Sequence, residues 1–578
     1  MVSCSFRPAL RALAVLIPAL WLGACGACGT REAGPAGPEA ADLVVRGGRI
    51  VTLEPTQPEA TALAARDGRI VALGAIGDVN AFIGPETRIV ELHGRLAVPG
   101  FIEGHGHFMS LGDARIQLDL NAARSWQEIV EMVAAAAAQV PPGEWIRGRG
   151  WHQEKWDAAP EPAVEGFPVH ASLSAASPEN PVMLTHASGH GLFANARAME
   201  LAGVDRATPD PPGGEIVKDA AGEPIGFFRE TAMGLIRAAR GDAAPESELR
   251  RMARLASDEC LAKGVTSFQD AGSDFATVEL LRGLAAEGAL GVRLWMMVRD
   301  SNAALAEKLG AAKTGAEGDG HFAVGAIKVS VDGALGSRGA WLLEPYSDSP
   351  GSTGLNLVPI DEVRETAALA IEHGVQLCIH AIGDRANREV LDVFEEAFAA
   401  HPEKSDLRWR VEHAQHLHPD DIPRFASLGV IASMQNVHCT SDGPWVPDRL
   451  GDKRSEEGAY VWRKLLDSGA VVMNGTDVPV EDVDPIANFY SGVTRRMRNG
   501  ERFSPGQVMS REEALKSTTL DAAYGAFEED LKGSLAVGKL ADVTVLSKDI
   551  LTVPEDEILS AKVLYTIVGG KVAYRGGG

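Results

Sequence analysis

The pattern of hydrophobic and polar positions divides the chain into two β-rich ends and a long middle of mixed character. Three segments near the N-terminus alternate apolar and polar residues and break at glycines, which is typical of half-buried strands: Asp42–Leu53, Ala62–Leu73 and Ile89–Val98. The same pattern returns near the C-terminus in Ala541–Leu546 and Val563–Tyr574. We therefore expect both termini to build one small β-sandwich domain, from residues 42–98 and 533–578.

The middle of the chain alternates short apolar runs with helical stretches such as Glu362–His373 and Asn387–Ala400. An apolar run that leads into His105 is the first predicted strand, and seven more follow: Val265–Phe268, Arg293–Val298, Ala326–Val331, Val375–His380, Arg408–His413, Val430–Met434 and Val471–Asn474. Eight strands that alternate with helices predict an α/β fold, a (β/α)8 TIM barrel, over residues 99–532. The interval after His107 is longer than a βα loop requires, so we expect an insertion at about residues 113–250.

The first predicted barrel strand ends on two histidines, in the stretch PGFIEGHGHF. Because side chains alternate along a strand, His105 and His107 project from the same face. Two imidazoles on one edge suit a divalent first-row metal ion. Taken alone, the pair is better explained by two structural histidines at a strand end.

Four more polar residues stand in or at the ends of later predicted strands: Lys328, His380, His413 and Asp477. The ends of parallel barrel strands meet on one face, so these side chains are expected to converge with the two histidines. Asp477 taken alone could cap a turn, and His413 could bond to backbone. Lys328 is harder to explain structurally, because a lysine is rarely buried in a strand without a partner. Together they predict a metal-dependent catalytic centre.

Composition narrows the classes of partner. The chain has 578 residues, 45% of them hydrophobic and 23% charged, as in an ordinary globular protein. Its formal net charge of −24 argues against nucleic acid or anionic lipid as a partner. We expect a small-molecule partner, and the oligomeric state stays open, a homodimer included.

The N-terminus resembles a bacterial lipoprotein signal. Arg7 and Arg11 precede the apolar run Ala12–Leu22, which is too short to span a membrane as a stable helix. The run leads into Leu-Gly-Ala-Cys, with the cysteine at Cys25. We expect a signal peptide over residues 1–24, lipidation of Cys25, a flexible tether over residues 25–41, and membrane anchoring in the periplasm or at the cell surface. The alternative is a cytoplasmic enzyme with a wrongly assigned start codon.

Seven fragments in order carry a family resemblance: PGFIEGHGH, GVTSFQDAG, IKVSVDGALGSR, IHAIGDRA, VEHAQ, NGTDVPV and GSLAVGKLADVTVL. From about Asp42 to its C-terminus the chain resembles the amidohydrolase superfamily. Within it, the resemblance is to the YtcJ-like branch of the amidohydrolase 3 family, which includes N-substituted formamide deformylase.

The resemblance implies a binuclear zinc site. His105, His107 and Asp477 would bind the first metal, His380 and His413 the second, and Lys328 would bridge both as an N-carboxylated lysine. Metal-activated hydroxide would then hydrolyse a non-peptide C–N bond of a small amide, with Asp477 as the base and then the acid. The alternatives are an esterase or lactonase of the same fold, a non-catalytic solute-binding lipoprotein, and a barrel with a purely structural metal.

Substrate contacts are expected from loops over the barrel mouth, at Trp151, His190 and Arg338. His190 would support an oxyanion, and Arg338 would either clamp a carboxylate or pair with one of the chain's own acidic residues. The remaining histidines considered are expected on the surface or behind the ligands: His93, His373, His416, His418 and His438.

Overall fold

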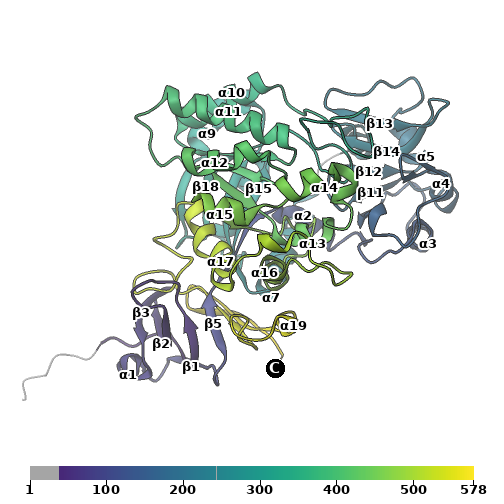
Figure 1. Ribbon diagram of the computed structural model, residues 1–578. Coiled ribbons are helices and arrows are strands. Elements are labelled where there is room, and N and C mark those ends of the chain that lie inside the picture. Colours follow the sequence, from purple (N-terminus) through teal and green to yellow (C-terminus); the bar gives the residue numbers. More distant parts are fainter. Residues whose placement is uncertain (1–37, 242–243, 578) are drawn as a thin grey trace, which may run out of the picture. The chain divides into compact units, whose positions relative to one another are not determined.

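The computed structural model describes residues 38–241 and 244–577 (Figure 1). The predicted signal peptide, the lipidation site Cys25 and most of the predicted tether lie outside the described residues. No helix within the described ranges is long and apolar enough to cross a membrane.

Eight parallel strands form the barrel, in the order β22-β21-β20-β19-β18-β16-β15-β6. Their bounds are β6 (Phe101–Gly106), β15 (Val265–Ser273), β16 (Arg293–Val298), β18 (Phe322–Ser330), β19 (Gln376–Ala381), β20 (Arg410–His413), β21 (Ile431–Met434) and β22 (Val472–Asn474). Backbone hydrogen bonds connect the first strand with the segment after the last: Asp477 N–H donates to His105 O at 2.7 Å, and His107 N–H donates to Val478 O at 2.7 Å. The predicted TIM barrel is confirmed.

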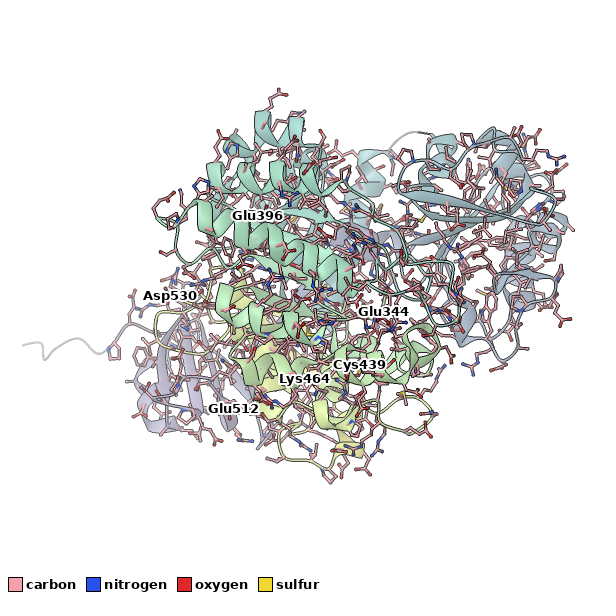
Figure 2. All side chains as sticks on the ribbon, turned by 45° about the horizontal axis from the view of Figure 1, so that its top comes forward. Glu344, Glu396, Cys439, Lys464, Glu512 and Asp530 are labelled. Carbon is pink, nitrogen blue, oxygen red and sulfur yellow. The ribbon has the colours of Figure 1, made fainter. Side chains whose placement is uncertain are left out.

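Helices cover the barrel strands, and nearly all residues of these strands are buried, as in a parallel sheet that is covered on both faces. Two helices of the described residues lie between β18 and β20, namely α10 (Ile360–His373) before β19 and α11 (Asp384–Ala400) after it. α11 buries Val390, Leu391 and Phe394 and leaves Glu396 exposed, where Oε2 accepts from Arg364 Nε of α10 at 2.8 Å (Figure 2). The other helices that follow or separate barrel strands are α7 (Glu246–Ala262), α8 (Phe275–Ala286), α9 (Asn302–Ala312), α12 (Ile422–Leu428), α13 (Asn436–Asp442), α14 (Val446–Gly458), α15 (Trp462–Ser468), α16 (Pro485–Thr494), α17 (Arg511–Ser517) and α18 (Leu520–Gly525).

Strands from both termini form one β domain, as expected. Hydrogen bonds join them in an eight-stranded sheet of order β25-β24-β23-β5-β1-β2-β3, with β4 paired to β1. The bounds are β1 (Leu43–Val51), β2 (Glu59–Arg66), β3 (Arg69–Gly74), β4 (Arg88–Glu91), β5 (Leu96–Pro99), β23 (Val543–Leu546), β24 (Val563–Val568) and β25 (Lys571–Arg575). Val45 packs in one buried cluster and the adjacent Val44 in another, so both faces of β1 are covered.

The long interval between β6 and β15 folds into a subdomain with a sheet of its own, ordered β13-β14-β12-β11-β8-β7 (Figure 1). Its strands are β7 (Leu118–Asp119), β8 (Ile146–Trp151), β11 (Val182–His186), β12 (Gly191–Ala194), β13 (Gly214–Lys218) and β14 (Pro224–Glu230). Its helices are α3 (Trp126–Ala137), α4 (Ala171–Ala176), α5 (Ala196–Leu201) and α6 (Met233–Arg240). A cluster of buried aromatic and aliphatic side chains makes its core. We refer to residues 118–240, from the start of β7 to the end of α6, as the insertion.

Candidate metal centre

The predicted ligands come from the carboxyl ends of the barrel strands. His105 belongs to β6 and His107 follows it, Lys328 and His380 belong to β18 and β19, His413 ends β20, and Asp477 follows β22. The topology therefore gathers all six at one end of the barrel, the end where TIM barrels carry their catalytic groups.

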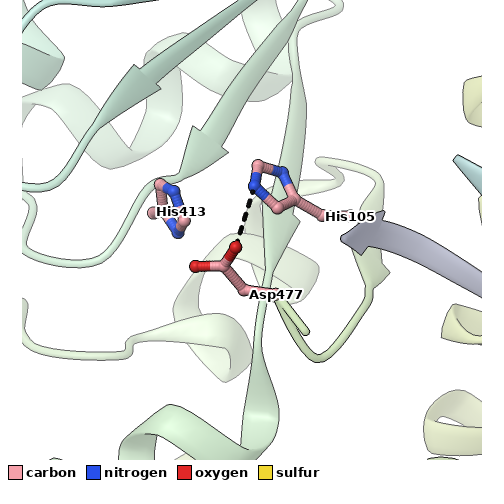
Figure 3. A group of neighbouring side chains, drawn as sticks. All are labelled: His105, His413 and Asp477. Carbon is pink, nitrogen blue, oxygen red and sulfur yellow. Dashed lines mark ion pairs between the residues drawn. The ribbon is translucent and has the colours of Figure 1, made fainter. Parts of the chain in front are cut away.

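Three of these side chains form the centre of the group (Figure 3). The ligand atoms of His105, His413 and Asp477 all lie within 4.8 Å of one another. Asp477 Oδ1 lies 3.5 Å from His105 Nε2 and 3.2 Å from His107 Nε2. The His380 ring follows, with its centroid 4.5 Å from that of His413. The structure thus brings the predicted histidines and Asp477 together.

Three buried side-chain atoms of this group lack a hydrogen bond and could bind a metal ion. His105 Nε2, Asp477 Oδ1 and His380 Nε2 are buried and make no hydrogen bond among the described residues, although Asp477 Oδ1 faces His105 and His107 and His380 Nε2 lies 3.3 Å from Asp332 Oδ1. Buried polar atoms in proteins are almost always paired, so such a convergence of imidazole nitrogens and a carboxylate oxygen needs an explanation. A divalent cation would satisfy these donors, and the nitrogen and oxygen set suits zinc.

Two further side chains orient the histidines. Glu412 Oε2 lies 2.5 Å from His105 Nδ1, and Gln435 Oε1 lies 2.7 Å from His413 Nδ1. Each Nδ1–H donates to its oxygen, which leaves each Nε2 lone pair free for a metal. Burial raises the pKa of Glu412, but His105 and Arg410 outweigh burial and lower it to about 2. Glu412 is therefore a carboxylate.

Sequence reasoning missed Glu412 and Gln435, although each stands beside a predicted strand end. In a regular strand, Glu412 and His413 would face opposite sides. The backbone departs from that rule because His413 has φ of +76° and Ala414 has φ of +43°. Such conformations are costly for residues other than glycine and cluster at functional sites.

The stretch Asn-Gly-Thr-Asp positions Asp477 through contacts with Glu103. Glu103 Oε1 accepts from Thr476 N at 2.6 Å, and its Oε2 accepts from Thr476 Oγ1 at 2.8 Å. A Cβ on Gly475 would lie 2.3 Å from Glu103 Oε1, so only glycine fits there. Asp477 itself has φ of +58°, and its N–H donates to His105 O. These contacts place the Asp477 carboxylate against the β6 histidines.

Lys328 lies inside the barrel, 3% exposed, and no carboxylate of the described residues lies within ion-pairing distance. Its Nζ donates to Ala271 O at 3.5 Å. Burial lowers the pKa of Lys328, and the nearby Glu412 opposes that effect. A buried lysine with one long hydrogen bond is an unusual structural residue.

His190 reaches this centre from the insertion. Its Nδ1 lies 2.7 Å from Glu230 Oε2, and its ring centroid lies 5.0 Å from that of His380. Burial lowers the pKa of His190, but Glu230 outweighs burial and raises it above its ordinary value. Glu230, which the sequence analysis missed, packs against the loop after β18: a Cβ on Gly333 would lie 2.0 Å from its Oε1, and one on Gly339 2.6 Å.

The structure places the two other predicted substrate residues away from the centre. Trp151 is fully buried in the insertion core, where its Nε1 donates to Leu184 O at 3.0 Å, so the expectation of a substrate contact is wrong. The next residue, His152, lines the cavity at the site instead. Arg338 pairs with Asp348, with Nη2 2.8 Å from Oδ2, which matches the acidic-partner alternative.

His438 also departs from expectation. We expected it on the surface or behind the ligands, yet it lines the cavity beside His413. Its ring is nearly parallel to that of His413 at 6.4 Å, and its Nε2 is buried without a hydrogen-bond partner among the described residues. Nothing in the sequence around it marks it as a site residue.

Two cavities adjoin at this end of the barrel. The inner one, of about 50 Å³, is bordered by His190, His413, His438 and Asp477. The outer one, of about 680 Å³, shares Lys155, Trp445 and Glu481 with it as lining residues. A substrate would pass through the outer cavity to reach the metal ligands.

Comparison with known proteins identifies the family. The model of the amidohydrolase family matches residues 88–574, most of the chain. The chain belongs to the amidohydrolase family. The chain is similar to the putative amidohydrolase YtcJ of Bacillus subtilis, to which it is 31% identical over 85% of this chain and 91% of that protein. N-substituted formamide deformylase of Arthrobacter pascens is 27% identical over 92% of this chain and 98% of that protein.

Two further similarities extend the comparison. Protein LONG AFTER FAR-RED 3 of Arabidopsis thaliana is 34% identical over 92% of both chains. An uncharacterized metal-dependent hydrolase from Pyrococcus horikoshii has 25% identity and a TM-score of 0.71, covering 89% of this chain and 99% of its own. The family and this neighbour support a hydrolase that uses a divalent metal.

Proposed function

We propose that this amidohydrolase cleaves a non-peptide C–N bond in a small-molecule amide. The observation that carries the proposal is the convergence at the mouth of the barrel of three buried atoms, His105 Nε2, His380 Nε2 and Asp477 Oδ1, that make no hydrogen bond among the described residues. N-substituted formamide deformylase, a relative over almost the whole chain, supports an amide as the substrate class. We further propose that His105, His107 and Asp477 hold one zinc ion and that His380 and His413 hold a second.

Asp477 is the proposed proton carrier. A divalent metal, when bound, lowers the pKa of a water molecule and polarises an acyl oxygen. His107 and His105 outweigh burial and hold the pKa of Asp477 well below its ordinary value, so the group is a carboxylate. Asp477 Oδ1 faces these two histidines, which leaves Oδ2 to accept the proton of water and deliver it to the leaving nitrogen.

His190 is the proposed oxyanion donor. Its Nδ1–H donates to Glu230, whose carboxylate raises the pKa of His190 and so favours the protonated ring, in which Nε2–H is a second donor. A positioned donor at the developing oxyanion stabilises the transition state of acyl transfer.

Lys328 is the proposed bridge. A free ammonium beside two cations would be repelled, whereas an N-carboxylated lysine offers two anionic oxygens. The burial of Lys328 and the lack of a described carboxylate partner support this assignment. Five ligands and a bridge also exceed the four positions of one tetrahedral zinc.

The test is hydrolysis by zinc-supplemented protein of N-formyl, N-acyl, dipeptide and lactone panels. We expect turnover of formyl or acyl amides, and a loss of about 10²- to 10⁴-fold in Asp477→Asn. Asp361→Asn, on α10 and 95% exposed at its side chain, is the matched control and retains activity. Turnover of lactones alone would contradict the C–N assignment.

A further inference from the structure

The outer cavity is rich in basic residues although the chain carries a net charge of −24. Six arginines and lysines line it: Arg115, Arg124, Arg149, Lys155, Arg496 and Arg498. Four of them have a carboxylate partner, as in the pairs of Arg124 with Asp157 and of Lys155 with Glu481. Arg149 and Arg498 have no carboxylate within ion-pairing distance among the described residues. The cavity therefore holds two uncompensated cations.

The acidic residues of the same walls are mostly neutralised. Glu154 pairs with Arg449 and Asp482 with Lys263, in addition to the two pairs already named. Asp119 is the exception, and its Oδ1 accepts from the Asn121 amide at 2.8 Å. Two free cations against one free carboxylate leave the cavity attractive to anions.

Arg149 is the better placed of the two cations. It belongs to β8 of the insertion, and its side chain is partly buried. Its Nε–H donates to Pro479 O at 3.4 Å and Nη2 donates to Ala187 O at 3.1 Å. A guanidinium has five N–H donors, so three of them remain for a ligand. Burial lowers the pKa of Arg149 to about 10, which still leaves it cationic at neutral pH.

The position of Arg149 relates it to the reaction. Pro479, which it contacts, stands two residues after Asp477, and Asp477 acts on Arg149 electrostatically. An anion held by Arg149 would therefore lie in the outer cavity beside Val478 and Pro479, next to the loop that carries Asp477. Arginine binds carboxylates in a planar, two-pronged geometry that lysine does not match.

We propose that the outer cavity is an anion subsite, in which Arg149, assisted by Arg498, binds a carboxylate at the far end of the substrate. The substrates would then be acylamino carboxylates, in which a short chain separates the scissile amide from the carboxylate. This inference rests on the proposed amide hydrolysis and adds the substrate class to it.

The experiment compares N-acetylglycine, N-acetyl-4-aminobutyrate and N-formyl-4-aminobutyrate with their neutral carboxamides, on zinc-loaded enzyme. The readout is selectivity, the kcat/KM for the acid divided by that for the carboxamide. We expect the wild type to favour the acids, and Arg149→Gln to lower selectivity about 10- to 100-fold, as expected for a lost charge-assisted hydrogen bond. Arg498→Gln, at an exposed position, should lower it by a smaller factor. Arg197→Gln, in α5 outside the cavity, is the control for the same change of charge and keeps wild-type selectivity.

A binding measurement separates this inference from the proposed function. 6-Oxoheptanoate replaces the amide nitrogen of N-acetyl-4-aminobutyrate with carbon and is not hydrolysed. Calorimetry should show that the wild type binds it more tightly than its neutral carboxamide, and that Arg149→Gln removes the difference.

The outcomes are distinguishable. If acids and carboxamides are hydrolysed equally well by the wild type, the anion subsite is refuted while amide hydrolysis stands. If Arg149→Gln slows both kinds of substrate equally, Arg149 only connects the insertion with the Pro479 loop, and the subsite is again refuted. If no amide is hydrolysed but 6-oxoheptanoate binding depends on Arg149, the proposed function fails and the subsite stands.

Discussion

Replacing Glu412 by glutamine tests whether the hydrogen bond behind His105 controls metal affinity. Both side chains are fully buried, and Nδ1 and Oε2 are 2.5 Å apart. A hydrogen bond to a charged group contributes about 1.5–3 kcal/mol and a neutral one about 0.5–1.5 kcal/mol, so the loss of charge costs about 1–2 kcal/mol. An amide that turns its NH₂ toward His105 would also force the proton onto Nε2 and block the ligand atom.

The lost charge alone predicts zinc binding about 5- to 30-fold weaker in Glu412→Gln, because about 1.4 kcal/mol corresponds to a factor of ten, and an amide turned toward His105 would weaken it further. The assay is competition between the metal-free protein and a chromophoric chelator, with circular dichroism to verify the fold. Glu528→Gln is the matched control, since Glu528 is buried and pairs with Lys532, which donates to Ser267 near the start of β15. It should leave zinc affinity unchanged. Zinc affinity of Glu412→Gln within twofold of the wild type would refute the reasoning, and an equal loss in Glu528→Gln would attribute the effect to general destabilisation.

Three other changes test separate parts of the structure. Gly475→Ala should destabilise the protein by about 2 kcal/mol in urea unfolding, because the new Cβ meets Glu103, whereas Gly234→Ala on the open side of α6 should not. Lys328→Ala should contain fewer than about two equivalents of metal by elemental analysis and should lose activity, which added propionate should restore in part. Propionate should not restore Lys328→Arg, because the guanidinium fills the space and keeps its charge. Two bound metals with normal turnover in Lys328→Arg would exclude the bridge. Cys25→Ala should move the protein from the membrane fraction to the soluble fraction, and a wild type found wholly in the soluble fraction would contradict lipid anchoring.

The barrel was predictable because its strands carry a strong local signal. Strands such as β16 and β19 are buried along their whole length, so each appears in the sequence as an apolar run bounded by polar or glycine residues. The β domain was predictable for a similar reason, since Val44 and Val45 on β1 alternate between two buried clusters. The insertion could only be located by its length, because several of its strands are short, such as β7 and β12, and they are separated by connections of unequal length.

The convergence of the candidate metal ligands was predictable, and the residues behind them were not. Position at a strand end implies convergence on one face, which is a consequence of topology alone. Glu412 reaches the site only because the backbone takes a positive φ at His413, and no sequence pattern announces that. Trp151 shows the converse error: an aromatic residue in a loop-rich stretch was assigned to substrate binding, whereas strand alternation places it in the core and His152 at the cavity.

The structure divides the work of the site between two parts of the chain. Every predicted metal ligand comes from the barrel, whereas His190 and Arg149 come from the insertion. The two parts meet at fixed points, where Glu230 packs against Gly333 and Arg149 donates to Pro479 O. Substitutions in the insertion can therefore change which molecules enter without displacing the metal ligands.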